Sequence, residues 1–324
     1  MGTSNTPSSV YQQTQWGHET TVGTAVPATT AFRCLEVEAK PNVETDLIRP
    51  SGSRFASTSY VKKSMTDISA EGIPSWTELP SLLQWALGDN VDTIDNGDGT
   101  FSHSFELAPY SATTRTFEIG EPGTQNYSRV RGAFVKSFGL TFGRQSGDSK
   151  MTLEGMGMNW EDDVIPTGNP IYPSVKPIVA NDVELYLDNT LGAAGTTRMA
   201  GVLSFEFSSG DMRSDAWYFN HLAPSFSDTV DQAMTEATIT LVMKADADGR
   251  AFFDALAIQE TKYIQVRAFG TDGNDFTGTF AVRAKGHERG DEEGIWAVTA
   301  ELVIVEDENG FSHEFVVTND EATV

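Results

Sequence analysis

The chain has 324 residues, of which 39% are hydrophobic, so it is long enough for two ordinary domains or one large all-β domain. Its 46 acidic and 22 basic residues give a formal net charge of -24, which argues against a surface that binds nucleic acid by neutralising phosphates. The acidity also has a simpler explanation, because net charge keeps an abundant protein in solution.

Cys34 is the only cysteine, which excludes an internal disulfide and a cysteine-based zinc site. It lies in the apolar-rich run Phe32–Val37, so we expect a buried thiol and synthesis in a reducing compartment. We find no stretch of signal-peptide character and no run of about 18 apolar residues. The expectation is a chain that is neither secreted by that route nor membrane-spanning.

The first part of the chain predicts an arm followed by two strands. Residues Met1–Gln15 are small and polar, which indicates a flexible arm with order beginning at Trp16. Alternation in Phe32–Glu38 is typical of a half-buried strand, and Val61–Ser69 is a second extended run. The stretch between them, about Asn42–Tyr60, is expected to be a long loop.

A short amphipathic helix follows at Leu79–Leu87. Leu79, Leu82, Leu83 and Leu87 form its apolar stripe, and Thr77 is the expected N-cap. After this helix come four extended runs, which are Ser102–Leu107, Arg115–Ile119, Phe134–Phe142 and Met151–Met158.

The second part repeats this order after a proline-rich segment. Pro166, Pro170, Pro173 and Pro177 favour an inter-domain linker over residues 161–180. We then expect a strand at Val202–Ser208, a long loop at about Ser209–Asp231, a strand at Ala237–Lys244 and a helix at Arg250–Ala257 capped by Asp248. The last four extended runs are Tyr263–Phe269, Thr279–Ala284, Trp296–Val305 and Glu314–Thr318.

Seven elements thus recur in the same order at an offset of about 160 to 170 residues, which indicates an internal duplication. Any all-β protein shows strands at regular intervals, but the single helix at the same place in each series favours duplication. The predicted fold is mainly β, with two tandem β-sandwich or partly closed barrel units, each flanked by one short helix. Their expected bounds are residues 16–160 and 181–324, on either side of the linker.

Candidate catalytic residues do not emerge. The five histidines are dispersed and form no metal-binding pair on a helix, and no nucleotide-binding or nucleophile motif is present. Asp92–Gly99 has acids and glycines like a calcium loop but lacks the distal glutamate, so a hairpin turn is favoured. The acidic clusters Glu161–Asp163 and Asp291–Glu293 are expected in loops as solvated charge. We therefore predict no enzyme, no metal site and no cofactor.

Several short motifs resemble those of the major tail tube proteins of siphophages, the bacteriophages with long non-contractile tails. The segment Trp16–Pro27 resembles the family's opening, in which Trp-Gly, Glu-x-Thr and Gly-Thr-x-Val-Pro recur. The resemblance continues through Glu71-Gly72, the helix from Leu79 to Gly88 and Arg131–Phe142. In the second half it covers Val202–Phe207, Ala237–Ala245 and Gly294–Val305.

The resemblance implies a virion protein, made in the bacterial cytoplasm, that forms stacked rings around a channel for double-stranded DNA. Six sandwich units per ring are implied, so a chain with two units predicts a trimeric, pseudo-hexameric ring, with a hexamer of whole chains as the alternative. Further implied partners are the tape-measure protein, the tail terminator and the distal tail or baseplate proteins. DNA is expected to pass without specific binding, along a negatively charged wall.

Two sets of residues follow as candidates. Strand alternation turns Glu36, Glu38 and Glu206 away from the core, towards either the channel or the outer surface, and Glu36 and Glu206 are expected at matching positions. Candidate ring-stacking contacts are Trp16, Arg49, Arg54, Lys62 and Lys63, the four basic residues lying in an expected loop that meets an acidic surface of a neighbouring copy.

Two other classes of function remain open from the sequence. One is a different β-sandwich component of the virion, such as a tail terminator, a baseplate hub element or a capsid decoration protein. The other is a carbohydrate-binding or carbohydrate-hydrolysing β-protein, which would need exposed aromatic platforms or converging acids in a cleft.

Overall fold

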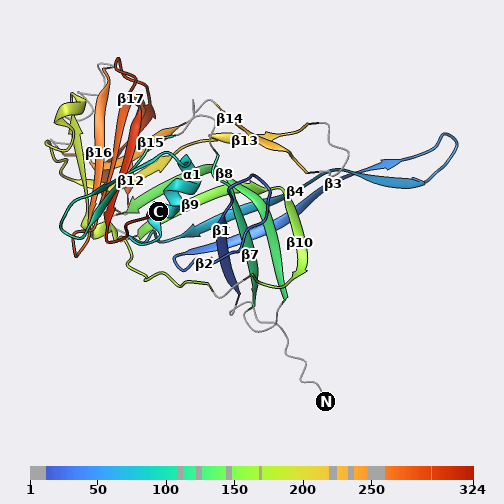
Figure 1. Cartoon of the computed structure of the whole chain (residues 1–324). Helices are drawn as coiled ribbons and strands as arrows, with labels where there is room; N and C mark the ends of the chain where they lie inside the picture. The colour runs from blue at the N-terminus through green and yellow to red at the C-terminus, as the bar shows by residue number, and fades with distance from the viewer. Residues whose placement is uncertain are drawn as a thin grey trace.

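The protein is mainly β, and seventeen of its strands form one hydrogen-bonded network in the computed structural model. A further two-stranded sheet lies beside this network (Figure 1). The structure describes residues 12–107, 112–121, 126–143, 148–167, 170–218, 225–232, 237–246, 260–292 and 294–324.

The first half of the chain is organised around one long strand, β8. Its N-terminal part pairs with β7 and β10, and its C-terminal part pairs with β9, which continues through β4 to β3. Strand β1 extends the first group by pairing with β7. The elements are β1 (Gln13–His18), β2 (Thr30–Ala31), β3 (Leu35–Ile48), β4 (Thr58–Gly72), α1 (Leu79–Leu87), β5 (Val91–Asp95), β6 (Phe101–Phe105), β7 (Arg115–Glu121), β8 (Asn126–Gly143), β9 (Asp148–Gly157) and β10 (Asn159–Val164).

The second half is organised in the same way around β17. The N-terminal part of β17 pairs with β16 and β19, and its C-terminal part pairs with β18, which continues through β15 to β12. Strand β11 pairs with β16. The elements are η2 (Ala180–Asp182), β11 (Val183–Asp188), η3 (Leu191–Ala193), β12 (Val202–Ser208), β13 (Arg213–Ala216), β14 (Asp228–Asp231), β15 (Thr238–Lys244), β16 (Lys262–Phe269), β17 (Asp275–Glu292), β18 (Ile295–Ile304) and β19 (His313–Asn319).

Pairing between described strands joins the halves at two places. Strand β12 pairs with the C-terminal part of β8, which produces a continuous antiparallel sheet of eight strands in the order β3, β4, β9, β8, β12, β15, β18 and β17. The hairpin β5–β6 of the first half pairs with β19 of the second. Figure 1 shows β3 and β17 at opposite ends of the molecule.

An aromatic cluster forms the core where the halves meet. Phe207 on β12 lies 5.1 Å from Phe138 on β8, 5.2 Å from Phe280 on β17 and 5.6 Å from Phe315 on β19, measured between ring centroids. All four rings are buried, so both halves contribute to one apolar layer beneath the eight-stranded sheet.

Helix α1 is buried on nearly all sides, as a helix this short requires for stability. The indole Nε1 of Trp85 donates to the backbone oxygen of Ala133 on β8 at 3.0 Å. The N-cap is Glu78 and not the expected Thr77, whose hydroxyl instead bonds Ser174. The Glu78 carboxylate accepts the backbone N–H groups of Arg33 and Cys34, so this position ties the helix to the entry of β3.

Many of the predicted elements are confirmed, but their matching between halves is shifted by one strand. The helix at Leu79–Leu87 and the strand at Val202–Ser208 have the predicted bounds. Among the described strands of the second half, none corresponds to the hairpin β5–β6. Strands β7, β8, β9 and β10 correspond in pairing to β16, β17, β18 and β19. The helix expected at Arg250–Ala257 and its Asp248 cap lie outside the described residues.

Both expected long loops were wrong in part, because each contains strands. Residues 42–48 and 58–60 continue β3 and β4 into one long hairpin, while the Ser209–Asp231 stretch contains β13 and β14. The polar arm was also drawn too long, since Gln13–Gln15 belong to β1 and pair with β7. The described strands do not close into a barrel within one chain.

The proline-rich linker is held against the first half. Its expected start falls within β10, which reaches Val164 because it pairs with β8. Further along, the backbone N–H of Ile171 donates to Thr29 at 2.6 Å, and that of Trp76 donates to Lys176 at 2.9 Å. Backbone hydrogen bonds therefore hold parts of this segment against the first half.

Candidate functional surface

The eight-stranded sheet has one apolar face and one acidic face. Leu35, Val37, Phe205 and Phe207 are buried on the core side, as the alternation predicted. The glutamates between them are exposed on the other side, where several further acids lie. The acids of this face, which we call the acidic face, are Glu36, Glu38, Asp67, Glu71, Glu154, Glu206, Glu288 and Glu301.

Two matching rows of residues cross the acidic face. In the first half Glu38 is paired with Ser69, which is paired with Glu154, and Glu154 is paired with Ser137. In the second half the same positions are taken by Glu206, Thr240, Glu301 and Gly286. Each row ends beside a β-bulge, which contains Lys136 in β8 and Lys285 in β17.

Glu38, and not Glu36, is therefore the counterpart of Glu206. The predicted match of Glu36 with Glu206 was wrong because it used only the alternation along β3 and β12, in which Glu36 and Glu38 face the same side. Cross-strand pairing separates the two positions. The corrected match puts a glutamate at the first and third positions of each row, so the acidic pattern occurs twice in the sheet.

Basic side chains offset part of this charge. Lys40 pairs with Glu38 at 2.8 Å, Lys150 with Glu71 at 2.7 Å and Lys285 with Glu301 at 2.5 Å. Among the described residues, Glu36 and Glu206 have no basic partner within ion-pairing distance. The face keeps a net negative charge.

Both ends of the eight-stranded sheet are open. Among the described strands, β3 pairs with β4 only, and β17 beyond Gly286 pairs with β18 only. Open edges present unpaired backbone N–H and C=O groups, which another strand can use. Inside the chain the corresponding positions are joined, since the C-terminal part of β8 pairs with β12.

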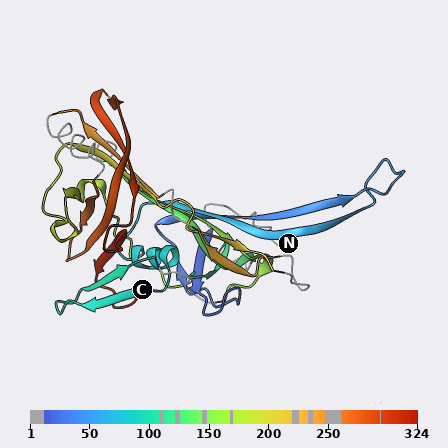
Figure 2. The ribbon, with the colours of Figure 1, turned by 90° about the horizontal axis from the view of Figure 1, so that it is seen from above.

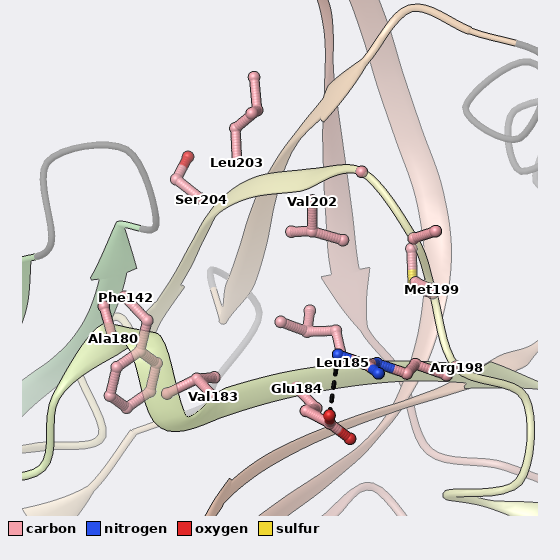
Figure 3. A pocket seen from close by; sticks show the side chains of 12 residues that line it. Phe142, Ala180, Val183, Glu184, Leu185, Arg198, Met199, Val202, Leu203 and Ser204 are labelled. Atoms are coloured by element: carbon pink, nitrogen blue, oxygen red, sulfur yellow. Dashed lines mark ion pairs between the residues drawn. The ribbon is translucent and has the colours of Figure 1, made fainter.

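A groove near the open edge of β3 extends across β3, β4 and β9. It lies between β1, which contributes Gln13 and Thr14, and β3, which contributes Leu35 and Val37. The second half has a related pocket between β11 and the start of β12, where Phe142 of β8 lies beside Val183 (Figure 3). The charged side chains in the lining of that pocket are Glu184 and Arg198, which pair with each other at 2.8 Å.

The hairpin of β3 and β4 projects far beyond the rest of the sheet (Figures 1 and 2). Residues 42–65 of this hairpin, which we call the projecting hairpin, pair only with each other among the described strands, because β9 pairs with β4 from Thr66 onwards. Phe55 is 78% exposed and Leu47 is 67% exposed. An isolated two-stranded hairpin is marginally stable in water, so exposed apolar side chains here favour a protein partner.

Four of the five candidate stacking residues lie in the projecting hairpin. Arg49 and Arg54 are exposed near its tip, Lys62 pairs with Asp46 at 2.9 Å, and the Lys63 Nζ atom lies 4.5 Å from the Trp217 ring. The structure places Trp16 elsewhere, in β1, where the Arg115 guanidinium lies 3.6 Å from its ring.

The segment between β12 and β15 is packed on the first half. Arg213 on β13 is fully buried and donates to the backbone oxygens of Ala86 and Leu87 at 2.6 and 2.8 Å, the C-terminal end of α1. The backbone N–H of Met212 donates to Lys136 on β8 at 2.7 Å. These hydrogen bonds between the halves were not predicted, because the sequence shows only an arginine in a stretch expected to be a loop.

Residues of the Trp16–Pro27 motif have structural roles. The buried carboxylate of Glu19 accepts bonds from the hydroxyls of Thr114 and Thr116 and from the backbone N–H of Gly132. A Cβ atom on Gly17 would lie 2.3 Å from the carbonyl oxygen of Pro27, so the motif folds tightly on itself.

The remaining sequence candidates do not converge. In the part of the chain that the structure describes, no three His, Cys, Asp or Glu side chains are grouped to hold a metal ion. Asp92 lies in β5, and the hairpin turn favoured over a calcium loop is confirmed between β5 and β6, with positive φ angles of 78° at Gly97 and 92° at Gly99. Asp291 lies in β17 and Glu161 in β10, so neither is in the expected loop.

Cys34 is half-buried, and burial followed by its contact with Glu78 raises the pKa of the thiol to about 12.

Comparison with family models and with curated proteins gives no match. No model of a protein family matches the chain, and no curated protein matches it. Within the described residues no helix has the length and apolar character needed to cross a membrane.

Proposed function

We propose that the chain is the ring subunit of a siphophage tail tube, built as two tandem copies of one tail-tube-like unit. The observation that carries this proposal is the eight-stranded sheet with an acidic face, in which the pairing order of the first half recurs in the second. Each unit is a sandwich of two sheets that share a long strand, β8 or β17. The resemblance in the sequence supplies the family.

The geometry of the repeat favours a closed ring. Glu206 is paired with Thr141 on β8, four residues beyond Ser137, which ends the first row. One unit therefore shifts the pattern by four residues over four strands. With a rise of about 3.3 Å per residue and a strand spacing of about 4.8 Å, this corresponds to a strand tilt of roughly 35°. Closed barrels have tilts of about 35–45°, so repetition of this unit suits closure.

Three copies complete the ring in this proposal. The resemblance implies six units per ring, and each chain supplies two. A hexamer of whole chains is the alternative. Each chain then closes its open β3 and β17 edges on its neighbours, which removes the exposed edges of the free chain.

The acidic face lines the channel in this account. A negative wall repels the DNA backbone, so the genome passes without specific binding. The test introduces one cysteine, Glu206→Cys, into a Cys34→Ser background. A maleimide carrying a large polyethylene glycol should label this cysteine in the free chain but not in tubes, whereas Ile94→Cys, in the edge strand of the other layer, should be labelled in both. Full labelling of Glu206→Cys in tubes would place the acidic face outside.

The projecting hairpin bridges successive rings in this account. Its exposed apolar residues and the basic residues Arg49 and Arg54 suit contact with another acidic copy of the chain. Deleting Leu47–Thr58 should leave rings that cannot polymerise, and charge reversal at Arg54 and Lys62 should weaken stacking. Normal tubes from the deletion variant would refute this role.

The proposed partners are further copies of the chain, the tape-measure protein inside the tube, the tail terminator, and the distal tail or baseplate proteins. The proposed location is the tail of the virion. The direct experiment is electron microscopy of the purified protein, which should show long hollow rods. A tail terminator, hub or decoration protein of similar architecture would give single rings or isolated particles instead.

A further inference from the structure

We infer that the open edge of β17 binds the open edge of β3 on a second copy of the chain in one particular register, with Lys40 of one copy opposite Glu288 of the next. This inference rests on the proposed ring function and names the partner and contacts of its seam. It follows from the internal joint between β8 and β12, which provides a template for the same joint between chains.

The first step transfers β8 onto β17. The bulges at Lys136 and Lys285 fix the match, because each bulge directly precedes the residue that ends an acidic row. These residues are Ser137 in β8 and Gly286 in β17. Gly139 and Thr141 then correspond to Glu288 and Gly290. Leu140, which faces the core, corresponds to Arg289.

The second step transfers β12 onto β3. Glu206 corresponds to Glu38 through the matched rows, and Ser208 therefore corresponds to Lys40. In the internal joint Glu206 is paired with Thr141, Phe207 with Leu140 and Ser208 with Gly139. The same joint between chains pairs Glu38 with Gly290, Ala39 with Arg289 and Lys40 with Glu288, in antiparallel orientation.

The charges suit this register. Lys40 and Glu288 are both exposed and both belong to the acidic face, so they meet on the same side of the sheet. In the free chain Lys40 pairs with Glu38 in an exposed contact, which costs little to rearrange. Gly290, which has no side chain, lies opposite Glu38 and leaves space for its carboxylate.

The seam between chains is also more polar than the internal joint. Inside the chain, Phe138 and Phe142 of β8 lie 5.1 and 6.3 Å from Phe207 and Phe205, measured between ring centroids. The counterparts of Phe138 and Phe142 on β17 are His287 and Asp291. Backbone pairing and charge thus replace aromatic packing, which favours a free chain that stays unassembled at low concentration.

Charge exchange tests the register. Lys40→Glu places two carboxylates opposite each other, and cross-strand pairs contribute about 0.2–1 kcal/mol each, so the critical concentration for assembly should rise by up to about fivefold per seam. Glu288→Lys should act similarly, and the double variant should restore assembly. The matched control is Lys150→Glu, which lies on the same face but pairs with Glu71 in the interior of the sheet. Single variants that behave like this control, or a double variant worse than both, would overturn the register.

A cross-link gives an independent measurement. In a Cys34→Ser background, Ala39→Cys with Arg289→Cys should form disulfides between chains under mild oxidation, giving covalent multimers in denaturing gels. Ala39→Cys with Asp291→Cys, two residues out of register, should not. Cross-linking of the second pair in preference to the first would contradict the inference. Should the unsubstituted protein fail to form rings at any concentration, the proposed function itself would be wrong.

Discussion

Replacing Phe207 with alanine should cost the protein a large part of its stability, because this ring holds the two halves together. Phe207 is 1% exposed and contacts Phe138 of the first half and Phe280 and Phe315 of the second. Truncation of a buried phenylalanine costs about 3–5 kcal/mol, and each aromatic pair adds about 0.5–1.5 kcal/mol beyond the buried area. With three such pairs lost, we expect a loss at the upper end, about 4–5 kcal/mol.

The assay is urea unfolding of the unassembled chain, followed by tryptophan fluorescence. The transition midpoint should fall while the slope stays constant, since the surface exposed on unfolding is unchanged. The control is Ser208→Ala, at the next residue on the exposed face, which should change stability by less than about 0.5 kcal/mol. A loss below about 2 kcal/mol for Phe207→Ala, or an equal loss in the control, would refute the role of the aromatic cluster in joining the halves.

Three further predictions concern polar groups that are buried or half-buried. Arg213→Met should lower the free energy of unfolding by about 3 kcal/mol, because the last carbonyls of α1 lose their buried partner; a loss below about 1 kcal/mol in urea would contradict this. Burial lowers the pKa of His313 to about 4, below the value of about 6.5 in the unfolded chain. The unfolded chain therefore binds more protons between these values, and stability should fall by about 1–2 kcal/mol from pH 7 to pH 5. His313→Gln should reduce this pH dependence, and an unchanged slope would count against it. Because burial raises the pKa of Cys34 to about 12, iodoacetamide at pH 8 should modify it at least about 100-fold more slowly in the folded than in the unfolded chain, as measured by mass spectrometry. Similar rates in both states would be inconsistent with a half-buried, protonated thiol.

Local patterns in the sequence were sufficient for elements whose burial follows a simple period. The four leucines of α1 and the alternation in β12 predicted both the bounds of these elements and the side that faces the core. The same alternation correctly turned Glu38 and Glu206 away from the core. These features depend on neighbours along the chain, which the sequence displays directly.

Features that depend on pairing between distant strands could not be predicted in this way. The β5–β6 hairpin interrupts the first half and shifted the matching of all later strands. Residues two apart on a strand face the same side, so alternation alone could not decide whether Glu36 or Glu38 is the counterpart of Glu206; only the cross-strand pairing does. The long β3–β4 hairpin was taken for a loop because most of its side chains are exposed on both faces and show no period.

The mass and symmetry of the assembled ring test the central claim most directly, namely that the two open sheet edges close on sister chains around the acidic face. Native mass spectrometry of isolated rings, together with end-on electron micrographs, would measure both. The account predicts three chains of 35.2 kDa each in a threefold ring around an open channel. A chain that stays at its single mass at all concentrations, or rods without a channel, would contradict it.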